Sequence, residues 1–201
     1  MGHTQLLVAT RNKGKLREFD RLLEDCGLTL VSLSDISITD EVEETGATFE
    51  ENAILKAGEY HRLSGLPTLA DDSGIEVDAL DGSPGVRSAR FAGEHATDAD
   101  NIALLLGKLR GVPDDRLNAR FRCVIAVALP NQPMQTFTGD CEGRIVRTPR
   151  GDNGFGYDPV FYLPDLGKTV AELSPEEKHR ISHRGVAARK ALQWLQSITK
   201  S

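Results

Sequence analysis

Apolar residues recur along this chain with two periods, and the two periods predict different elements. Short runs of aliphatic residues bounded by glycine or polar residues are typical of strands. These runs lie at 5–10, 28–33, 68–71, 75–80, 119–129, 134–143 and 144–149. Apolar residues three and four positions apart predict helices. Such stretches lie at 15–27, 49–63, 101–111 and 185–198.

Capping residues support three of the predicted helix starts. Thr48 and Glu51 have the spacing of a capping box. Thr97 with Asp100 opens another helix, and Ser174 stands before a proline and two acids. Strands and helices alternate early in the chain, and several strands follow one another in the middle. The pattern therefore predicts an α/β fold, with a mixed sheet flanked by helices and two lobes around a central cleft.

Composition sets limits on this picture without changing it. The 201 residues are 39% hydrophobic and 27% charged, which suits a single soluble globular domain over 1–201. The net charge of -6 argues against non-specific nucleic-acid binding, because such binding requires a basic surface. Cys26, Cys123 and Cys141 form no C-x-x-C pair, so neither a disulfide framework nor a structural zinc site is expected. No signal peptide or membrane-spanning run is found, and we expect a cytoplasmic protein without a membrane partner.

The stretch 9–19, ATRNKGKLREF, places a polar loop between a predicted strand and a predicted helix. The first N–H groups of that helix point into the loop, and the helix dipole favours an anion there. Lys13 and Lys15 add positive charge, while Thr10 and Asn12 add neutral hydrogen-bonding groups. The loop is a candidate phosphate site, although its glycine spacing is not that of a Walker A loop. The alternative is an ordinary strand–helix turn with solvated lysines.

Two adjacent acids end the apolar run 68–71. Asp71 and Asp72 should point to opposite sides if they lie in a strand, because strand side chains alternate in direction. With Glu44 in an acidic loop, they offer the carboxylates that Mg²⁺ takes alongside substrate phosphate oxygens. The alternative for 71–74 is a turn, since Asp, Ser and Gly all favour turns.

A glycine-rich stretch, 152–159, holds Phe155 and Tyr157. Glycine permits close backbone approach to a flat ligand, and aromatic rings offer stacking worth about 1–3 kcal/mol per base. The alternative is a tight turn whose aromatic residues pack into the core.

A basic segment, 176–185, joins two predicted helices. Lys178, His183 and Arg184 supply donors for a carbonyl or phosphate oxygen. A charged helix junction accounts for the same residues. Together with the lysine loop, the acids and the glycine–aromatic loop, however, this segment describes a Mg²⁺–nucleotide site.

Five ordered motifs carry a family resemblance that runs nearly end to end. They are ATRNKGKLREF, EETGATFEENAILKA, LADDSGIEVDAL, NGFGYDP and KHRISHRG. The chain resembles the Ham1-like family of inosine/xanthosine triphosphate pyrophosphatases. The resemblance implies an elongated mixed α/β fold with a central nucleotide-binding cleft, and a homodimer. It also implies Mg²⁺-dependent hydrolysis of ITP, dITP and XTP to the monophosphate and pyrophosphate, which keeps deaminated purines out of nucleic acid.

The resemblance also implies roles for individual residues. Triphosphate contacts would come from the first loop, at Thr10, Arg11, Asn12, Lys13, Gly14 and Lys15. A further substrate contact would come from Ser73, and the metal ligands would be Glu44 and Asp72. Asp72 would also accept a proton, beside the further catalytic residues Asp71 and Lys56. The base-binding loop would be Phe155, Gly156, Tyr157 and Asp158, and the purine would be read by Lys178, His183 and Arg184.

Base selection is a problem of hydrogen-bond chemistry. Hypoxanthine and xanthine carry an acceptor oxygen at C6 and adenine carries a donor amine, so a donor such as Arg184 would favour the first two. Guanine shares the C6 oxygen, and the sequence shows no group that rejects it. Two other functions stay open: a pyrophosphatase for modified pyrimidine or canonical nucleotides, and a nucleotide sensor without turnover. The acids at Glu44 and Asp72 argue against a sensor.

Overall fold

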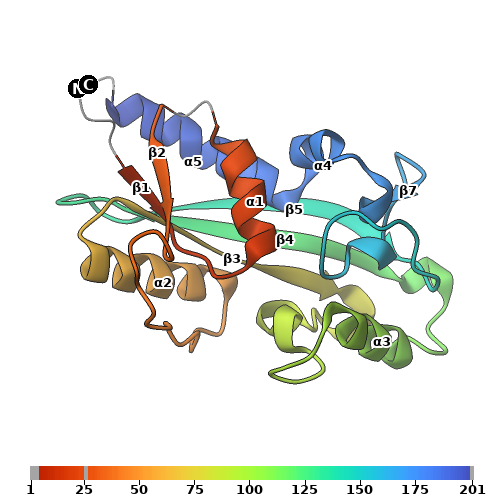
Figure 1. The fold of residues 1–201 in the computed structure, drawn as a ribbon. Coiled ribbons are helices and arrows are strands. Elements are labelled where there is room, and N and C mark those ends of the chain that lie inside the picture. Colours follow the sequence, from red (N-terminus) through yellow and green to blue (C-terminus); the bar gives the residue numbers. More distant parts are fainter. Residues whose placement is uncertain (1–4, 25–26, 200–201) are drawn as a thin grey trace. The chain divides into compact units, whose positions relative to one another are not determined.

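A computed structural model describes residues 5–24 and 27–199 (Figure 1). Its strands are β1 (Gln5–Val8), β2 (Thr29–Ser32), β3 (Thr68–Val77), β4 (Asn118–Ala128), β5 (Gln135–Ile145), β6 (Phe161–Leu163) and β7 (Lys168–Thr169). Its α-helices are α1 (Lys13–Leu22), α2 (Phe49–Ser64), α3 (Asp98–Lys108), α4 (Pro175–Ile181) and α5 (His183–Thr199).

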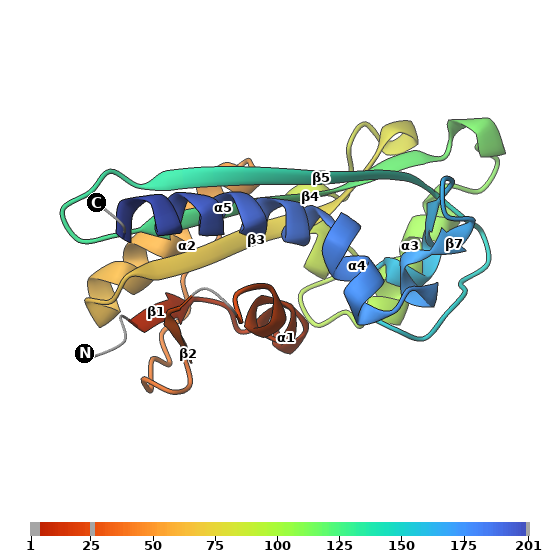
Figure 2. The ribbon, with the colours of Figure 1, turned by 90° about the horizontal axis from the view of Figure 1, so that it is seen from above.

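The strands form one mixed sheet in the order β2-β1-β3-β4-β5-β6-β7. β1 runs parallel to β2 and β3, with Leu7 opposite Thr68, whereas β6 runs antiparallel to β5 and β7. α5 lies along β4, as Figures 1 and 2 both show. The mixed sheet flanked by helices confirms the predicted α/β class.

The chain divides into two compact units. Unit 1 holds the residues up to Asp72, Cys123–Gly139 and the residues from Arg184 onward. Unit 2 holds Ser73–Arg122 and Asp140–His183. Three boundaries fall within β3, β4 and β5, so each of these strands contributes residues to both units, and the fourth falls after the first residue of α5. A single domain over 1–201 and a nucleotide-binding cleft stay predictions.

The core of unit 1 packs α1 and α5 on one face of the sheet. Its buried members are Leu6, Val8, Phe19, Leu23, Leu69, Cys123, Ile125, Val127, Ala187, Ala188, Ala191 and Leu195. The three alanines of α5 have short side chains, which let the helix backbone lie close to the strands. α2 covers the other face of β3 (Figure 1), and its Ala53 and Ala57 are fully buried. The first half of β3 is thus covered on both sides, as its continuous buried run from Thr68 to Asp72 requires.

Local capping sets where the first two helices begin. The Asn12 side-chain oxygen accepts hydrogen bonds from the N–H groups of Gly14 (2.8 Å) and Lys15 (3.1 Å). α1 therefore starts two residues before the predicted position, and it ends at Leu22. Thr48 and Glu51 form the predicted capping box of α2. This cap places α2 directly after the acidic loop.

Unit 2 has its own apolar core. It is built from β3, α3, β4, β5 and the segment around β6, and includes Ile75, Val77, Leu105, Phe121, Ile145, Val160 and Phe161. The rings of Phe121 and Phe161 lie 4.4 Å apart between centroids. Capping boxes at Thr97 and Ser174 open α3 and α4, as the sequence predicts.

Two strand predictions are wrong in the same way. The stretches 68–71 and 75–80 were expected as separate strands, but β3 continues from Thr68 to Val77. Likewise, 134–143 and 144–149 were expected as two strands, but β5 continues to Ile145. Gly74 and Gly143 do not end a strand. They allow close packing, since a Cβ at Gly143 would lie 2.6 Å from the Phe161 ring.

We expect Gly74→Ala to destabilise the protein by about 1–3 kcal/mol, because the added methyl overpacks the core. A Cβ there would lie 2.6 Å from the carbonyl oxygen of Gly85 and would overlap Ser88 Oγ. Urea unfolding measures the change. Gly58→Ala is the matched control, because its Cβ would meet only Met134 Cε at 3.4 Å. Ala favours a helix over Gly, so the control should be neutral or stabilising by up to about 1 kcal/mol. Equal stability of the two variants would contradict the expectation.

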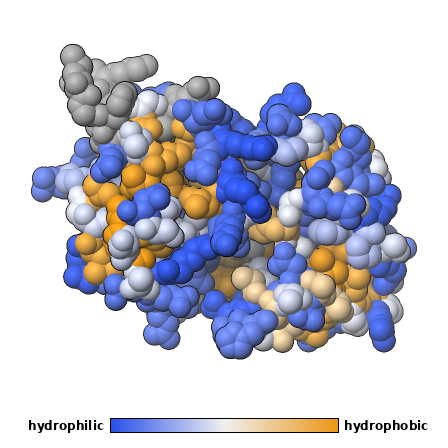
Figure 3. All heavy atoms as spheres, viewed as in Figure 1, coloured by the Kyte–Doolittle hydropathy of each residue, from blue (hydrophilic) through white to orange (hydrophobic). Residues whose placement is uncertain are grey.

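The face of the protein seen in Figure 3 is mixed in character, with hydrophilic side chains interspersed with separate hydrophobic patches. Within the described part of the chain, no helix combines the length and apolar character needed to cross a bilayer. Cys123 and Cys141 are free thiols, as expected, and Cys26 lies outside the described residues.

Candidate functional site

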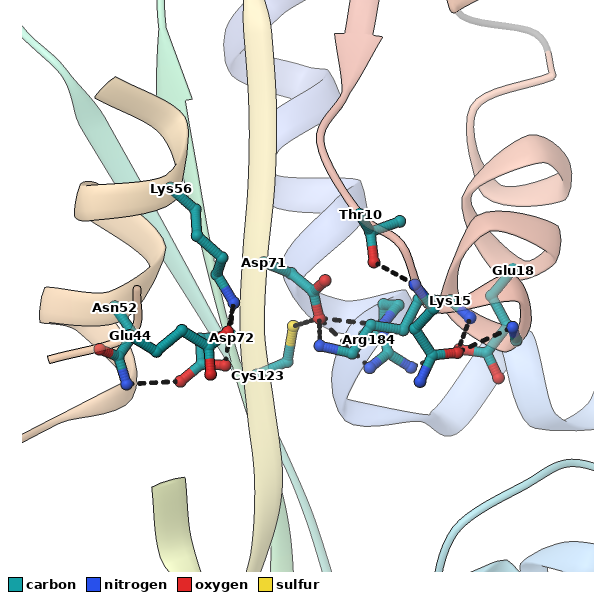
Figure 4. A network of polar contacts seen from close by, with 12 residues as sticks. Thr10, Lys15, Glu18, Glu44, Asn52, Lys56, Asp71, Asp72, Cys123 and Arg184 are labelled. Carbon is teal, nitrogen blue, oxygen red and sulfur yellow. Dashed lines mark hydrogen bonds and ion pairs between the residues drawn. The ribbon is translucent and has the colours of Figure 1, made fainter. Parts of the chain in front are cut away.

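Asp71 and Asp72 point to opposite faces of β3 (Figure 4). Asp71 lies on the side of α1 and α5, and Asp72 lies on the side of α2. Both are buried, with 2% and 5% of their surfaces exposed. The structure confirms that the adjacent carboxylates diverge. Their mutual repulsion is limited in this way, and each meets its own set of cations.

On the α2 side, Lys56 joins two carboxylates. Its ammonium nitrogen lies 2.6 Å from Glu44 Oε1 and 3.1 Å from Asp72 Oδ1. Asn52 adds a hydrogen bond, donating from Nδ2 to Asp72 Oδ2 at 3.2 Å. Glu44 comes from the acidic loop before α2, so residues distant in sequence meet at one point.

Burial by itself shifts the pKa values of Asp72 and Lys56 in opposite directions. Desolvation raises the pKa of Asp72 above its ordinary value, although Lys56 and Lys15 act in the other direction. Burial alone would lower the pKa of Lys56, but the charges of Asp72, Asp71 and Glu44 outweigh it and raise that pKa. Lys56 therefore stays charged, and Asp72 is a stronger base than an exposed aspartate.

On the opposite side, Asp71 is enclosed by cations. Lys15 Nζ lies 3.0 Å from Asp71 Oδ2, and both Nε and Nη2 of Arg184 lie 3.3 Å from the same oxygen. Arg184 also donates from Nη1 to Glu18 Oε2 at 2.5 Å. Burial would raise the pKa of Asp71, but Lys15, Arg184 and Lys56 hold it far below its usual range. Asp71 is thus a permanent anion that orients Lys15.

The first loop uses much of its hydrogen-bonding capacity internally. Thr10 Oγ1 accepts from the N–H of Asn12 at 3.2 Å, while Asn12 caps α1 as described. Lys13 and Gly14 form the first turn of α1. Arg11 reaches outward, and its Nη2 donates to the carbonyl oxygens of Ile38 (3.3 Å) and Asp40 (2.6 Å). This exposed arginine therefore holds the acidic loop. Contacts from the first loop to a triphosphate stay a prediction.

The predicted base loop lies in unit 2 and is held by two acids and a backbone carbonyl. Asp158 Oδ2 accepts from the Phe155 N–H at 3.0 Å, and the Gly156 N–H donates to Asp98 at 2.7 Å. The Tyr157 hydroxyl donates to the Ser88 carbonyl oxygen at 2.9 Å. A Cβ at residue 154 would overlap the Asp158 carboxylate, so glycine is required where the chain turns. Ser73, the first residue of unit 2, is half-buried on β3.

Lys178 and His183 lie with this loop. Lys178 Nζ is 2.5 Å from Asp158 Oδ2 and 4.8 Å from the centroid of the Phe155 ring. The His183 ring stacks on Phe121, with 4.8 Å between centroids and an angle of 16°. Lys178, His183, Phe121 and Asp158 are among the residues that line a cavity of about 10 Å³, which is roughly the room that one water needs.

Arg184 has a different environment from its neighbours in sequence. The resemblance groups it with Lys178 and His183, yet those two belong to unit 2 and Arg184 belongs to unit 1. Only 1% of its surface is exposed, and its guanidinium contacts Asp71 and Glu18. Recognition of a purine oxygen by Arg184 stays a prediction, and the contacts present are structural ion pairs.

Comparison with protein-family models matches residues 6–194 to the Ham1 family. The chain belongs to the Ham1 family. It is 53% identical over 195 residues to a protein of Geobacillus kaustophilus named dITP/XTP pyrophosphatase, with 96% of each chain covered. It is 46% identical over 193 residues to a Bacillus subtilis protein of the same name, covering 96% of this chain and 98% of the other.

Solved Ham1 structures match the fold as well. The Staphylococcus aureus Ham1 protein aligns with a TM-score of 0.87 and 42% identity, over 96% of this chain and 99% of that one. A HAM1 protein from Coxiella burnetii aligns with a TM-score of 0.88 and 44% identity, over the same shares. Another structure, titled nucleoside-triphosphatase / dITP/XTP pyrophosphatase, comes from Mycobacterium abscessus and aligns with a TM-score of 0.76 and 48% identity over 96% and 98%.

The donor set of this Ham1 protein suits a metal completed by substrate. Among residues 5–24 and 27–199, no group of three or more His, Cys, Asp and Glu could hold a metal ion. Glu44 and Asp72 nevertheless bring two carboxylates to one ammonium group. Mg²⁺ usually takes one or two protein carboxylates and obtains its other ligands from water and phosphate oxygens. The chemistry of the pair therefore fits Mg²⁺, with Lys56 beside it.

Sequence reasoning missed two polar residues of the Ham1 site. Asn52 has no exposed surface and contacts Asp72, and Glu18 is buried against Arg184. Each lies on the apolar side of its helix, next to Phe49 and Ala53 or to Phe19. A polar residue in an apolar stripe is the signal that identifies them, because a buried polar group needs a partner.

Proposed function

We propose that this Ham1 protein is a Mg²⁺-dependent pyrophosphatase of non-canonical purine nucleoside triphosphates. It hydrolyses ITP, dITP and XTP to the monophosphate and pyrophosphate, and so removes deaminated purines from the nucleotide pool. The dITP/XTP pyrophosphatase name of its relatives supports the reaction class. The observation that carries the proposal is the pairing of half-buried Glu44 and buried Asp72 through Lys56.

The chain's own groups supply most of the chemistry. Asp72 accepts a proton from the attacking water, and burial makes its carboxylate a better base for that step. The water oxygen forms a bond to the α-phosphorus, and the bond from that phosphorus to the bridging oxygen breaks, so that pyrophosphate leaves. Lys56 and Lys15 offset negative charge on the phosphates. Mg²⁺, when bound by Glu44 and Asp72, stabilises the charge of the leaving group.

Base recognition is assigned to the loop of unit 2. Phe155 offers an aromatic face, and Lys178 offers a donor for an acceptor oxygen such as that at C6 of hypoxanthine. Lys178 is already paired with Asp158, so its position is set before a base binds. From the family resemblance we further propose that the enzyme acts in the cytoplasm and forms a homodimer.

A panel of nucleotides tests this function. Purified protein is incubated with ITP, dITP, XTP, GTP, ATP, dUTP and dTTP, with and without Mg²⁺, and both pyrophosphate and orthophosphate are measured. We expect pyrophosphate to be released from ITP, dITP and XTP, and this release should require Mg²⁺. Rejection of ATP could reach about 10⁴-fold, because its C6 amine meets a donor instead of an acceptor. Orthophosphate as the first product would contradict the proposal, and preference for dUTP or dTTP would indicate a pyrimidine enzyme.

A further inference from the structure

Side chains on one face of α2 form hydrogen bonds with the acidic loop at regular intervals. These residues lie four positions apart along the helix, which places them on one side, one above the other. The contacts are Asn52 with the Gly46 N–H (2.7 Å), Lys56 with Glu44 (2.6 Å) and Tyr60 with the Asp40 carbonyl oxygen (3.2 Å). The loop therefore runs back along the helix and is attached at three levels. Glu44 is at the middle level.

Asn52, like Lys56, also contacts Asp72 of β3, but its side chain is neutral and completely buried. Its Oδ1 accepts from the Gly46 N–H, and its Nδ2 donates to Asp72 Oδ2 at 3.2 Å. The side chain has no exposed surface, so water does not compete for either bond. An amide has one acceptor end and one donor end, and these two partners determine which end faces which. Asn52 is therefore a direct link between the Glu44 loop and Asp72.

Gly46 makes this link possible from the loop side. A Cβ at this position would lie 2.6 Å from Glu51 Cβ and 2.7 Å from Asn52 Oδ1. Both separations are shorter than real Cβ contacts allow. Any larger residue must therefore move the loop away from Asn52. Because Gly46 is two residues from Glu44, such a movement is passed to the carboxylate.

The two oxygens of Asp72 have separate partners. Oδ1 is bound by Lys56, which also holds Glu44, whereas Oδ2 is bound by Asn52. A divalent cation taken by Glu44 and Asp72 would repel the Lys56 ammonium, so this ion pair is weakened when the metal is needed. Asn52 is neutral, and its bonds go to Oδ2 and to a backbone N–H. Its link can persist with the cation present.

We propose that Asn52 is a positioning residue that holds the Glu44 loop and the Asp72 carboxylate in register for one divalent cation. This inference rests on the proposed function, in which these two acids bind the metal. Loops move more than the elements they connect, and a binding carboxylate must be held within about 0.5 Å to act. Asn52 supplies that restraint without adding charge to the site.

The test compares two variants that break the same link from opposite sides. Asn52→Ala removes the amide, and Gly46→Ala displaces the loop while leaving Asn52 intact. Gly58→Ala, on the same helix but away from the link, is the matched control for an added methyl. Binding of Mn²⁺ alone to the nucleotide-free protein is measured by electron paramagnetic resonance. Pyrophosphate release from ITP is measured over a range of Mg²⁺ concentrations, and folding is checked by urea unfolding.

We expect both variants to bind Mn²⁺ about 10–100-fold more weakly, the range seen when a group supporting a metal ligand is removed. The Mg²⁺ concentration for half-maximal rate should rise in parallel. At saturating Mg²⁺ the KM for ITP should stay within about twofold of the wild-type value, because neither residue is placed at the nucleotide. In Asn52→Ala, the Gly46 amide should also exchange its hydrogen faster, since its acceptor is gone.

Several results would overturn the inference. One is a folded Asn52→Ala or Gly46→Ala variant whose Mn²⁺ affinity stays within twofold of wild type. Another is a Gly58→Ala variant that loses as much Mn²⁺ affinity as the other two. The third is a wild-type protein that binds no Mn²⁺. If Asn52→Ala does not fold, Gly46→Ala decides alone. Failure of the proposed function would give a different result. A wild-type protein that binds Mn²⁺ but releases no pyrophosphate would refute the proposed activity, and the effect of Asn52 on Mn²⁺ binding could still be measured.

Discussion

Asp72→Asn is expected to lower kcat for ITP hydrolysis by about 10²–10⁴-fold, the range in which a general base contributes. The amide keeps the shape of the side chain but accepts no proton from water, and it also removes one of two metal carboxylates. Lys56 would keep its contact with Glu44, so the fold should survive. Single-turnover rates and nucleotide binding are measured separately, and binding should remain within a few-fold of wild type.

The control for this variant is Asp114→Asn, which removes the same charge from an exposed ion pair with Arg147. We expect wild-type kinetics from it, because a surface pair contributes about 0–1 kcal/mol to stability and lies outside the site. An Asp72→Asn protein with more than about a tenth of the wild-type rate would mean that another group accepts the proton.

Arg184→Met is expected to lower the free energy of unfolding by about 3–5 kcal/mol, because it leaves buried carboxylates without their shared cation. Asp71 keeps Lys15 as a partner, but Glu18 loses the guanidinium that it contacts. Urea unfolding measures the loss. Arg62→Met is the control, because Arg62 and Glu59 form an exposed pair, with 66% and 41% of their side chains accessible. That variant should change stability by less than about 1 kcal/mol.

A double variant separates the charge effect from packing. Combining Arg184→Met with Glu18→Gln removes one of the stranded charges, so the loss should be smaller than the sum of the single losses. A loss below about 1 kcal/mol in Arg184→Met alone would show that the buried ion pairs carry little of the stability. The ITP-to-ATP ratio of the folded variant shows independently whether Arg184 also reads the base, as the family resemblance implies.

Local sequence predicted much of the secondary structure. The capping boxes at Thr48, Thr97 and Ser174 all formed where expected, because their hydrogen bonds join residues three positions apart. The divergence of Asp71 and Asp72 was likewise predictable, since it follows from the two-residue period of a strand. Two of the wrong boundaries arose at Gly74 and Gly143. A glycine that permits close packing and a glycine that ends a strand look the same in sequence.

The sequence by itself determined the fold class, the family resemblance and the motifs that supply Glu44 and Lys56 beside Asp72. Tertiary structure alone decided which partner each carboxylate meets. Arg184 lies 113 positions from Asp71, and no short-range pattern indicates that their side chains pair. Nor does the sequence show that Asn52 links the Glu44 loop to Asp72. The physical reason is that burial and charge pairing depend on which elements pack against β3, whereas propensity and periodicity describe each element by itself.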